Sequence, residues 1–290
     1  SALNFYDDER MIIEDFQIVY NREVCFPVRS RSAIKAFKAV DGKGLARVDF
    51  FVEKEKRVGD CYYITDSDYN HITNVLRMQK GDSFLVSEDG VSNLCFIEAI
   101  NSDSVVAKII KENYQDTNLP IKIVLFQGLP KSDKMELIIQ KCVELGVDSI
   151  VPVEMSRCVV KFEEKKKKSK QSRWQAISES AAKQSKRTVI PEIFDIMSYK
   201  QAMEKAKEMD LFIVPYESKD GMNSTKNALS KMKKGMKVGI LIGPEGDFSP
   251  EEVRLAVANG FEEITLGTQR FRTETAAVVA VDMVSIVNNL

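Results

Sequence analysis

Residues 241–284 read LIGPEGDFSPEEVRLAVANGFEEITLGTQRFRTETAAVVAVDMV, and this stretch decides the fold. One apolar run ends in Gly243-Pro244-Glu245-Gly246 and a second ends in Leu266-Gly267, as is typical of buried parallel strands. A helix signature follows the first run, with Ser249 as the cap and Pro250 at the first helical position. The stretch therefore predicts strands that alternate with helices.

The same alternation extends upstream to about residue 118. The predicted strands are 121–129, 149–155, 210–217, 237–243 and 262–267, and the predicted helices are 131–146, 172–185, a weak one after 217, 249–260 and 273–290. Near-continuous apolar strands of this kind are expected when helices cover both faces of a parallel sheet. We therefore expect an α/β domain over residues 118–290.

The segment before this domain has a different pattern. Short runs such as VDFFVE, DCYYIT, DSFLVSE, NLCFIEAI and SVVAKII are rich in β-branched and aromatic residues and are separated by turn residues. They predict a small β-barrel over residues 47–117, interrupted by one helical stretch at 66–82. Residues 1–46 show no clean period, and we assign them no role.

Composition excludes several classes of protein. A length of 290 residues fits about two domains. The formal net charge of −1 excludes a globally basic nucleic-acid binder but not a local basic face. The five cysteines form no Cys-x-x-Cys pair, and His71 is the single histidine. No apolar stretch has the length of a membrane span or of a signal peptide core. We expect a cytoplasmic protein with reduced thiols, no metal site and no membrane partner.

Three strand ends are candidates for a ligand site, because open α/β sheets bind ligands at the carboxyl ends of their strands. Tyr216 and Glu217 end the first strand, Gly243-Pro244-Glu245-Gly246 ends the second, and Leu266-Gly267 ends the third. A pocket lined by backbone amides and carbonyls suits an adenine edge and a ribose. The sequence has neither a P-loop nor a Rossmann fingerprint. Taken alone, the Gly-Pro-Glu-Gly segment is equally consistent with a tight strand-to-helix turn.

The quoted stretch resembles the signature of the SPOUT-class RNA methyltransferases, and in particular that of the ribosomal RNA small subunit methyltransferase E family, which methylates N3 of a uridine in 16S rRNA. Residues 127–161, 173–193 and 71–82 resemble further segments of that family, in order. The resemblance runs from about Val48 to Leu290. It implies a PUA-like β-barrel followed by a parallel sheet whose C-terminal segment is threaded into a trefoil knot, a rare topology. It also implies a homodimer, S-adenosylmethionine as the methyl donor and 16S rRNA of the small ribosomal subunit as the partner.

The resemblance assigns roles to individual residues. Arg272 matches the family's catalytic arginine. The positions implied at the cofactor are Tyr216, Glu217, Gly243, Pro244, Glu245, Gly246, Leu266, Gly267, Thr268 and Phe271. We expect RNA contacts to be basic and to come from the barrel and the first strand–helix loop, which selects Arg77, Lys131, Lys134 and Arg157. The alternative for Arg272 is a salt bridge at the helix start, for example to Glu274.

The sequence departs from the family pattern at several positions. Asp247 stands where the family has a second glycine, Thr268 and Gln269 replace a proline and an arginine, and Asp49 replaces an arginine at the start of the barrel unless Arg47 takes its place. These departures keep two other readings open. One is a SPOUT methyltransferase with another RNA target, and the other is a non-catalytic RNA-binding or ribosome assembly factor.

Four further features carry expectations of their own. The charged run Lys161–Arg173 fits either a solvated loop that leads into a helix or a patch that faces phosphates. His71 is expected to pack against its helix face. Phe126 and Trp174 are expected in the core.

Overall fold

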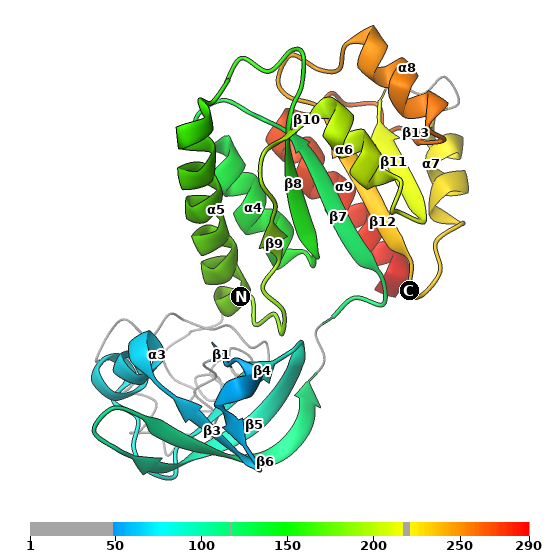
Figure 1. Cartoon of the computed structure of the whole chain (residues 1–290). Coiled ribbons are helices and arrows are strands. Elements are labelled where there is room, and N and C mark those ends of the chain that lie inside the picture. The colour runs from blue at the N-terminus through cyan, green and yellow to red at the C-terminus, as the bar shows by residue number, and fades with distance from the viewer. Residues whose placement is uncertain (1–48, 116–117, 217–220, 290) are drawn as a thin grey trace, which may run out of the picture. The chain divides into compact units, whose positions relative to one another are not determined.

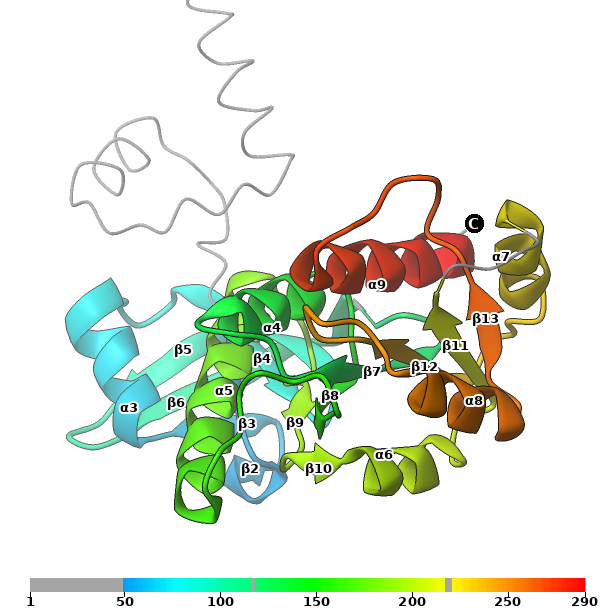
Figure 2. The same cartoon turned by 90° about the horizontal axis from the view of Figure 1, so that it is seen from above.

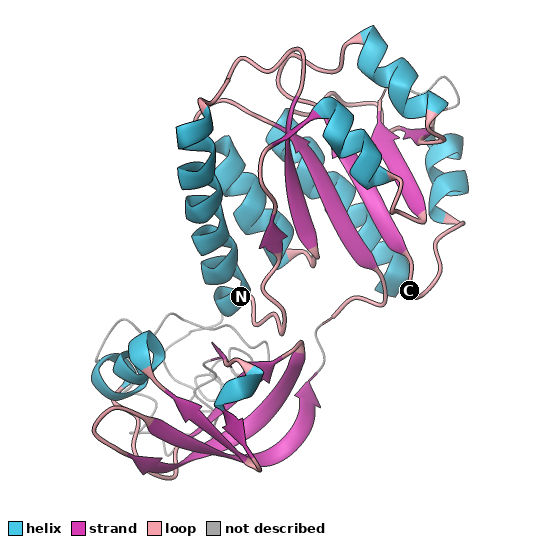
Figure 3. Ribbon diagram, in the orientation of Figure 1, coloured by secondary structure: helices cyan, strands magenta, loops and turns pink. Residues whose placement is uncertain are grey.

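The structure is a computed structural model that describes residues 49–115, 118–216 and 221–289. The predicted extension 1–46, Arg47 and the candidate Glu217 lie outside the described residues. Among the described helices, none combines the length and the apolar character that a membrane span requires. Figures 1 and 3 show a sheet domain followed along the chain by an α/β domain.

The first domain is built on a six-stranded sheet in the order β1-β4-β5-β6-β3-β2. Its strands are β1 (Asp49–Phe51), β2 (Arg57–Val58), β3 (Cys61–Ile64), β4 (Ser83–Glu88), β5 (Val91–Ile100) and β6 (Val105–Gln115), with a 3₁₀ turn η1 (Lys54–Lys56) before β2. Alternate side chains fill the core, where the rings of Phe50 and Phe84 meet edge to face at 5.3 Å. The β4–β5 turn uses Asp89 and Gly90, both with positive φ, as a tight hairpin requires.

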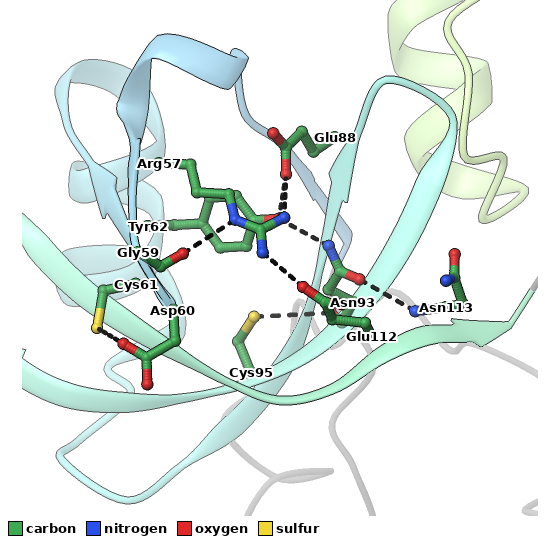
Figure 4. Close-up of polar contacts among 10 residues, drawn as sticks. All are labelled: Arg57, Gly59, Asp60, Cys61, Tyr62, Glu88, Asn93, Cys95, Glu112 and Asn113. Carbon is green, nitrogen blue, oxygen red and sulfur yellow. Dashed lines mark hydrogen bonds and ion pairs between the residues drawn. The ribbon is translucent and has the colours of Figure 1, made fainter.

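A buried polar network crosses this sheet (Figure 4). The Tyr62 hydroxyl donates to Glu88 Oε2 at 2.5 Å and accepts from Asn93 Nδ2 at 2.7 Å. The Arg57 guanidinium contacts Glu88 Oε2 at 3.0 Å and Glu112 Oε1 at 2.5 Å. Burial raises the pKa of Glu88, but the hydrogen bonds from Tyr62 and Arg57 outweigh burial, so the pKa lies below its usual value. The network therefore keeps a buried carboxylate charged and paired.

The second domain is a parallel sheet with the order β10-β8-β7-β12-β11-β13, and β9 pairs with β8 off this path. Its strands are β7 (Lys122–Gly128), β8 (Ser149–Glu154), β9 (Glu192–Ile193), β10 (Met197–Ser198), β11 (Leu211–Pro215), β12 (Lys237–Ile242) and β13 (Glu262–Ile264). β7 and β12 lie side by side at the centre, in a register from Lys122↔Lys237 to Gln127↔Ile242. The first strand of the domain thus pairs directly with a strand from its C-terminal part.

Helices cover both faces of this sheet, as predicted. The helices are α4 (Lys134–Glu144), α5 (Glu164–Gln184), α6 (Tyr199–Ala206), α7 (Met222–Leu229), α8 (Pro250–Ala258) and α9 (Thr273–Asn289). Figure 2 shows α4 and α9 on one face and α6 and α8 on the other. The rings of Phe126 and Phe212 meet at 5.0 Å in the core, and Trp174 is also buried, so both core predictions are confirmed.

Two predicted helices differ from the structure, and three elements were missed. The helix predicted at 172–185 begins at Glu164, because Lys has a high helix propensity and Phe162 packs edge-on against Trp174. The elements β9, β10 and α6 were not predicted, although α6 begins with a complete capping box between Ser198 and Gln201. The helix predicted at 66–82 consists of α3 (Asp66–Asn70) and a π-helical stretch, η2 (His71–Leu76).

Arg77 ends that π-helical stretch with a φ of +54°. The His71 ring meets the Phe50 ring in an edge contact at 6.1 Å, but the residue is exposed, so the expected packing is only partial.

Candidate active site at the carboxyl edge of the parallel sheet

One buried side chain joins the loop after β12 to the start of α9. The Thr273 hydroxyl donates to the Gly243 carbonyl at 2.6 Å and accepts from Gln127 Nε2 at 2.9 Å. Gln127 is fully buried and Thr273 is 7% exposed, so water does not compete for either hydrogen bond. The Gly-Pro-Glu-Gly loop, the end of β7 and the last helix are therefore fixed to one another.

The second glycine loop follows β13 and folds back on itself. The Thr265 hydroxyl donates to the Gly267 carbonyl at 3.0 Å and accepts from the Gly267 N–H at 3.3 Å. Gly267 has a φ of +124°, which disfavours any residue with a Cβ. Leu266 is half-buried against the core of the domain. The backbone of this loop is therefore held by hydrogen bonds within the loop itself.

Tyr216 connects this region to the first of the three strand ends. Its N–H donates to the Ile264 carbonyl at 2.9 Å, which extends the pairing of β11 and β13. Its half-buried ring meets the Phe248 ring edge-on at 6.2 Å. The ends of β11, β12 and β13 are thus neighbours at one edge of the sheet, as the strand pattern predicted.

The Gly-Pro-Glu-Gly loop is packed too closely for side chains at two glycines. A Cβ on Gly128 would lie 2.7 Å from the Pro244 nitrogen, and a Cβ on Gly246 would lie 2.9 Å from the Arg157 carbonyl oxygen. Asp247 has a φ of +61°, and its carboxylate accepts from the Phe248 N–H at 2.8 Å. Aspartate tolerates this left-handed conformation better than most residues, which accounts for its presence at the family's glycine position.

A lysine bridges two carboxylates beside this loop. Lys134 Nζ lies 3.1 Å from Glu245 Oε1 and 3.2 Å from Glu274 Oε2. Burial raises the pKa of Glu245, but hydrogen bonds from the Lys131 N–H and from Lys134 outweigh it and lower the pKa. The hydrogen bond to Glu245 also raises the pKa of Lys134. The bridge ties the β12 loop to the start of α9 a second time.

Arg272 precedes α9, and its side chain is exposed. Its carbonyl accepts from the Ala276 N–H at 2.8 Å in the first turn of the helix. Its guanidinium has no carboxylate partner among the described residues, because Glu274 pairs with Lys134 instead. Within the described residues the salt bridge that was the alternative for Arg272 is therefore absent, which leaves its charge available to a ligand.

The remaining candidates lie around the same loops, with one exception. Phe271 is 38% exposed and Thr268 is exposed. Arg157 Nη1 donates to the Gly246 carbonyl at 3.1 Å. Arg77 is exposed, but it belongs to the six-stranded sheet domain and not to this cluster.

The candidate RNA-binding residues Lys131 and Lys134 differ in their surroundings. Lys131 is exposed, and only its backbone N–H is engaged, at 3.0 Å from Glu245 Oε1. The Lys134 ammonium is shared between two carboxylates and is not a free cation. Of the two, Lys131 has the more available positive charge.

Sequence reasoning missed three residues that hold the site together. Gln127 is the one polar side chain in the interior of the β7 run, and Thr273 is the first residue of α9. Glu252 caps α8 through the Ser249 N–H at 2.8 Å and also accepts from the Ser156 N–H at 2.8 Å. A polar residue near the end of an apolar strand was the available signal for Gln127. The second partner of Glu252 is a long-range contact that has no local signal.

No group of three or more His, Cys, Asp or Glu side chains that could hold a metal ion occurs in the described part of the chain.

Comparison with known proteins identifies the family. Residues 117–285 match the model of an RNA methyltransferase domain, and residues 64–110 match that of an RNA methyltransferase PUA domain. The ribosomal RNA small subunit methyltransferase E of Bacillus subtilis is 36% identical over 243 residues, which cover 81% of this chain and 95% of the relative. The chain belongs to the ribosomal RNA small subunit methyltransferase E family. The resemblance of several sequence segments to this family therefore reflects membership of the family.

Solved structures of similar proteins agree with this assignment to the methyltransferase E family. A ribosomal RNA small subunit methyltransferase E from Neisseria gonorrhoeae, bound to S-adenosyl methionine, has a TM-score of 0.68 at 28% identity and covers 81% of this chain and 95% of that one. A methyltransferase from Legionella pneumophila, also with its cofactor bound, has a TM-score of 0.67 at 31% identity, with 84% and 98% covered. Both comparisons extend over the sheet domain and the α/β domain.

Proposed function

We propose that this protein transfers a methyl group from S-adenosylmethionine to N3 of a specific uridine in 16S rRNA of the small ribosomal subunit. The observation that carries the proposal is Arg272, which has no acidic partner among the described residues and lies next to backbone-lined loops fixed by Thr273. Family membership and the cofactor bound by two solved relatives support the reaction class and the donor. The position on the base rests on the resemblance of the sequence.

The residues present fit the cofactor. Gln127 Oε1 is buried and has no hydrogen-bond partner among the described residues, which leaves an acceptor beside the joined loops. Gly243 and Gly267 keep side chains out of the two loops. The residues that would hold the cofactor are Tyr216, Glu217, Gly243, Pro244, Glu245, Gly246, Leu266, Gly267, Thr268 and Phe271. They would position it mainly through backbone amides and carbonyls.

Methyl transfer to uridine N3 requires that the two reactants be positioned and that the negative charge on the uracil be stabilised. When bound, S-adenosylmethionine supplies a methyl group on a sulfonium, so no covalent enzyme nucleophile is required. Arg272 stabilises the negative charge that develops on the uracil as N3 gives up its proton. Arginine stays protonated near neutral pH and is therefore not the base. The fixed loops hold the reacting groups in place, which is the larger part of the rate gain for an activated donor.

The family architecture completes the proposal. Residues 47–117 form a PUA-like barrel that binds RNA, and residues 118–290 form the methyltransferase domain. The segment 265–272 runs from β13, at the edge of the sheet, back to the central strands, and we infer that it is threaded there as a trefoil knot. Arg77, Lys131 and Arg157 are proposed to contact RNA, whereas the Lys134 ammonium is engaged by Glu245 and Glu274.

We also infer a homodimer that acts in the cytoplasm, where the small subunit is made. Exposed apolar side chains on α4 and α9, namely Leu137, Ile286 and Val287, are available for such an interface. Light scattering of the purified protein tests the dimer. A monomer at micromolar concentration would contradict it.

The decisive experiment is mass mapping of 16S rRNA from a strain that lacks the gene and from a complemented strain. The proposal expects one N3-methyluridine to disappear and to return with the gene. If the modified uridine persists in the deletion strain, the substrate assignment is wrong.

Titration calorimetry with S-adenosylmethionine separates the enzyme from its alternative. Binding supports a methyltransferase with this or another RNA target. Absence of binding would favour a non-catalytic RNA-binding or assembly factor, in which the departures at Asp247, Thr268 and Gln269 have removed the cofactor site.

A further inference from the structure

The first turns of α5 carry an unusual concentration of positive charge. Residues 165–178 read KKKKSKQSRWQAIS, with six cations and no acid, in a chain whose formal net charge is −1. The two acids just before them, Glu163 and Glu164, do not balance this run, and Glu164 pairs with Lys167 at 2.8 Å. The basic character is therefore local to one end of one helix.

This arrangement works against the stability of the helix itself. The N-terminus of a helix favours negative charge, and like charges three or four residues apart repel one another. Lys165 and Lys168 are three apart, and Lys166 and Lys170 are four apart, all within the first two turns of α5. Residues that break a local rule in this way are expected where a function requires them.

The inner face of α5 explains why the helix forms in spite of these charges. Lys167 Nζ pairs with Glu154 Oε2 at 3.1 Å, Gln171 Nε2 donates to the Ile193 carbonyl at 2.7 Å, and Trp174 is buried. These side chains recur at helical spacing and dock the helix on its domain. The side chains on the opposite, outer face are therefore not needed to dock the helix.

The outer lysines have no internal partners. Lys165, Lys166 and Lys168 are exposed, and none has an ion pair within the described residues. Arg173 differs, because Glu136 Oε1 lies 2.8 Å from its Nε. Three unneutralised ammonium groups therefore lie on one helical segment, which we call the α5 lysine surface (Lys165, Lys166 and Lys168).

The α5 lysine surface lies at the same edge of the sheet as the candidate active site. Glu154 ends β8, so its pair with Lys167 places the first turn of α5 at the carboxyl edge. The loop between them returns to the site, where Arg157 Nη1 donates to the Gly246 carbonyl at 3.1 Å. In Figure 1 the start of α5 lies at the end of the sheet that also carries α8.

We propose that the α5 lysine surface binds the phosphate backbone of the RNA substrate and holds the strand that leads to the active site. Lysines on a flexible stem suit a backbone contact, because they attract phosphates without reading bases. The helix N-terminus further favours an anion at this position. A bound phosphate would also offset the repulsion between the lysines, which stabilises the complex. The inference rests on the proposed function for the identity of the substrate.

The test uses the full chain with Lys165, Lys166 and Lys168 all changed to Gln. A matched control changes Lys226, Lys233 and Lys234 to Gln, three exposed lysines on α7 and in the turn before β12. Binding to purified small ribosomal subunits and to protein-free 16S rRNA is measured over a range of KCl concentrations. We expect RNA affinity near 0.1 M salt to fall about ten-fold, and the slope of log K against log salt to fall by about two, in the α5 variant only.

The kinetic readout separates binding from chemistry. The KM for subunits should rise by about the same factor, with kcat and the affinity for S-adenosylmethionine unchanged, because none of these lysines is among the residues proposed at the cofactor or at the reacting base. The melting temperature should stay the same or rise, since removal of the charges relieves repulsion within the helix. A lower melting temperature that accounted for the loss of binding would overturn the proposal.

Each other outcome is also decisive. Equal losses in the α5 variant and the control would show general electrostatics and overturn the proposal. Loss of binding to subunits but not to protein-free rRNA would assign the surface to a ribosomal protein and overturn it as well. If the wild-type chain binds rRNA but leaves no N3-methyluridine, the proposed function fails, and the salt-dependent binding of the two variants still decides the role of α5.

Discussion

The ammonium of Lys134 lies 3.2 Å from the carboxylate of Glu274, and this pair leaves the neighbouring Arg272 without an acidic partner among the described residues. The acid that could have neutralised the arginine from within its own helix is already engaged by another element. The charge of Arg272 is thereby kept for a ligand.

Replacement of Arg272 by Ala is expected to remove most turnover and to keep cofactor binding. Loss of one donor that stabilises charge in a transition state costs about 10²–10³-fold in rate. The exposed side chain has no partner in the described structure, so the unfolding midpoint should not move. Methylation of unmodified small subunits and calorimetry with S-adenosylmethionine check both parts. Arg272→Lys, which keeps the charge, should lie between the two, and a wild-type rate in Arg272→Ala would remove the residue from the mechanism.

Replacement of Lys134 by Met is expected to weaken the site more than the fold. The change keeps the apolar stem but leaves Glu245 and Glu274 facing each other without a cation. Partly exposed ion pairs contribute little, so the free energy of unfolding should fall by less than about 1 kcal/mol. Cofactor affinity and turnover should fall, by about ten-fold on the scale of one misplaced contact.

Lys131→Met is the matched control for Lys134→Met, because the Lys131 side chain is exposed and only its backbone touches Glu245. We expect Lys131→Met to lower RNA affinity and to leave cofactor affinity unchanged. If both variants lose the same RNA affinity and neither changes cofactor binding, the prediction for Lys134 is wrong and Lys134 contacts RNA.

Replacement of Thr273 by Val is expected to destabilise the domain. The isosteric change removes the donor to the Gly243 carbonyl and the acceptor for Gln127, both in a buried setting. Unpaired buried polar groups cost about 1–3 kcal/mol. Urea unfolding measures the loss, and Thr273→Ser should restore most of it. Equal stability of Thr273→Val and the wild type would show that the two segments are held together by other contacts.

Asp247, directly after the Gly-Pro-Glu-Gly segment, offers a test of backbone strain. Its φ of +61° is favourable for glycine and tolerated by aspartate. Asp247→Gly should therefore keep stability within about 0.5 kcal/mol, while a β-branched Asp247→Val should cost about 1–3 kcal/mol. Thermal unfolding distinguishes them. A stable valine variant would mean that the loop can change conformation without cost.

The network around Glu88 predicts a pH dependence. Its pKa is lowered in the folded state, so its contribution is present above the unfolded value, near 4.5, and is lost as pH falls through the folded value. Urea midpoints measured from pH 6 down to pH 3 should drop in the wild type. In Glu88→Gln this part of the drop should be absent, although the midpoint at pH 6 should be lower. An identical pH profile in both proteins would show that Glu88 is not held ionised.

Much of the architecture could be read from local patterns. The runs that became β7, β8, β11 and β12 are mostly apolar, and the cap at Ser249 marks the start of α8. The three strand ends of the site were placed together by a general property of parallel sheets. Periodicity and capping are local signals, and these elements depend on little else.

The remaining features depend on contacts between distant segments. Lys134 was expected at RNA, but its position between Glu245 and Glu274 arises from three segments that meet only in the folded sheet. The start of α5 was missed, because a lysine run resembles a solvated loop until Phe162 and Trp174 are seen to pack together. The two-residue strands β9 and β10 are too short to leave a pattern.

The bond between Gln127 and Thr273 joins positions that are 146 residues apart. This bond, with the one from Thr273 to Gly243, fixes the Gly-Pro-Glu-Gly wall of the proposed cofactor pocket, so that wall is complete only when α9 has docked against β7 and β12. A nascent chain can therefore form its six-stranded sheet and most of its parallel sheet before this wall of the proposed site is complete. The proposed cofactor site can therefore be completed only after α9, the last helix of the chain, has been synthesised.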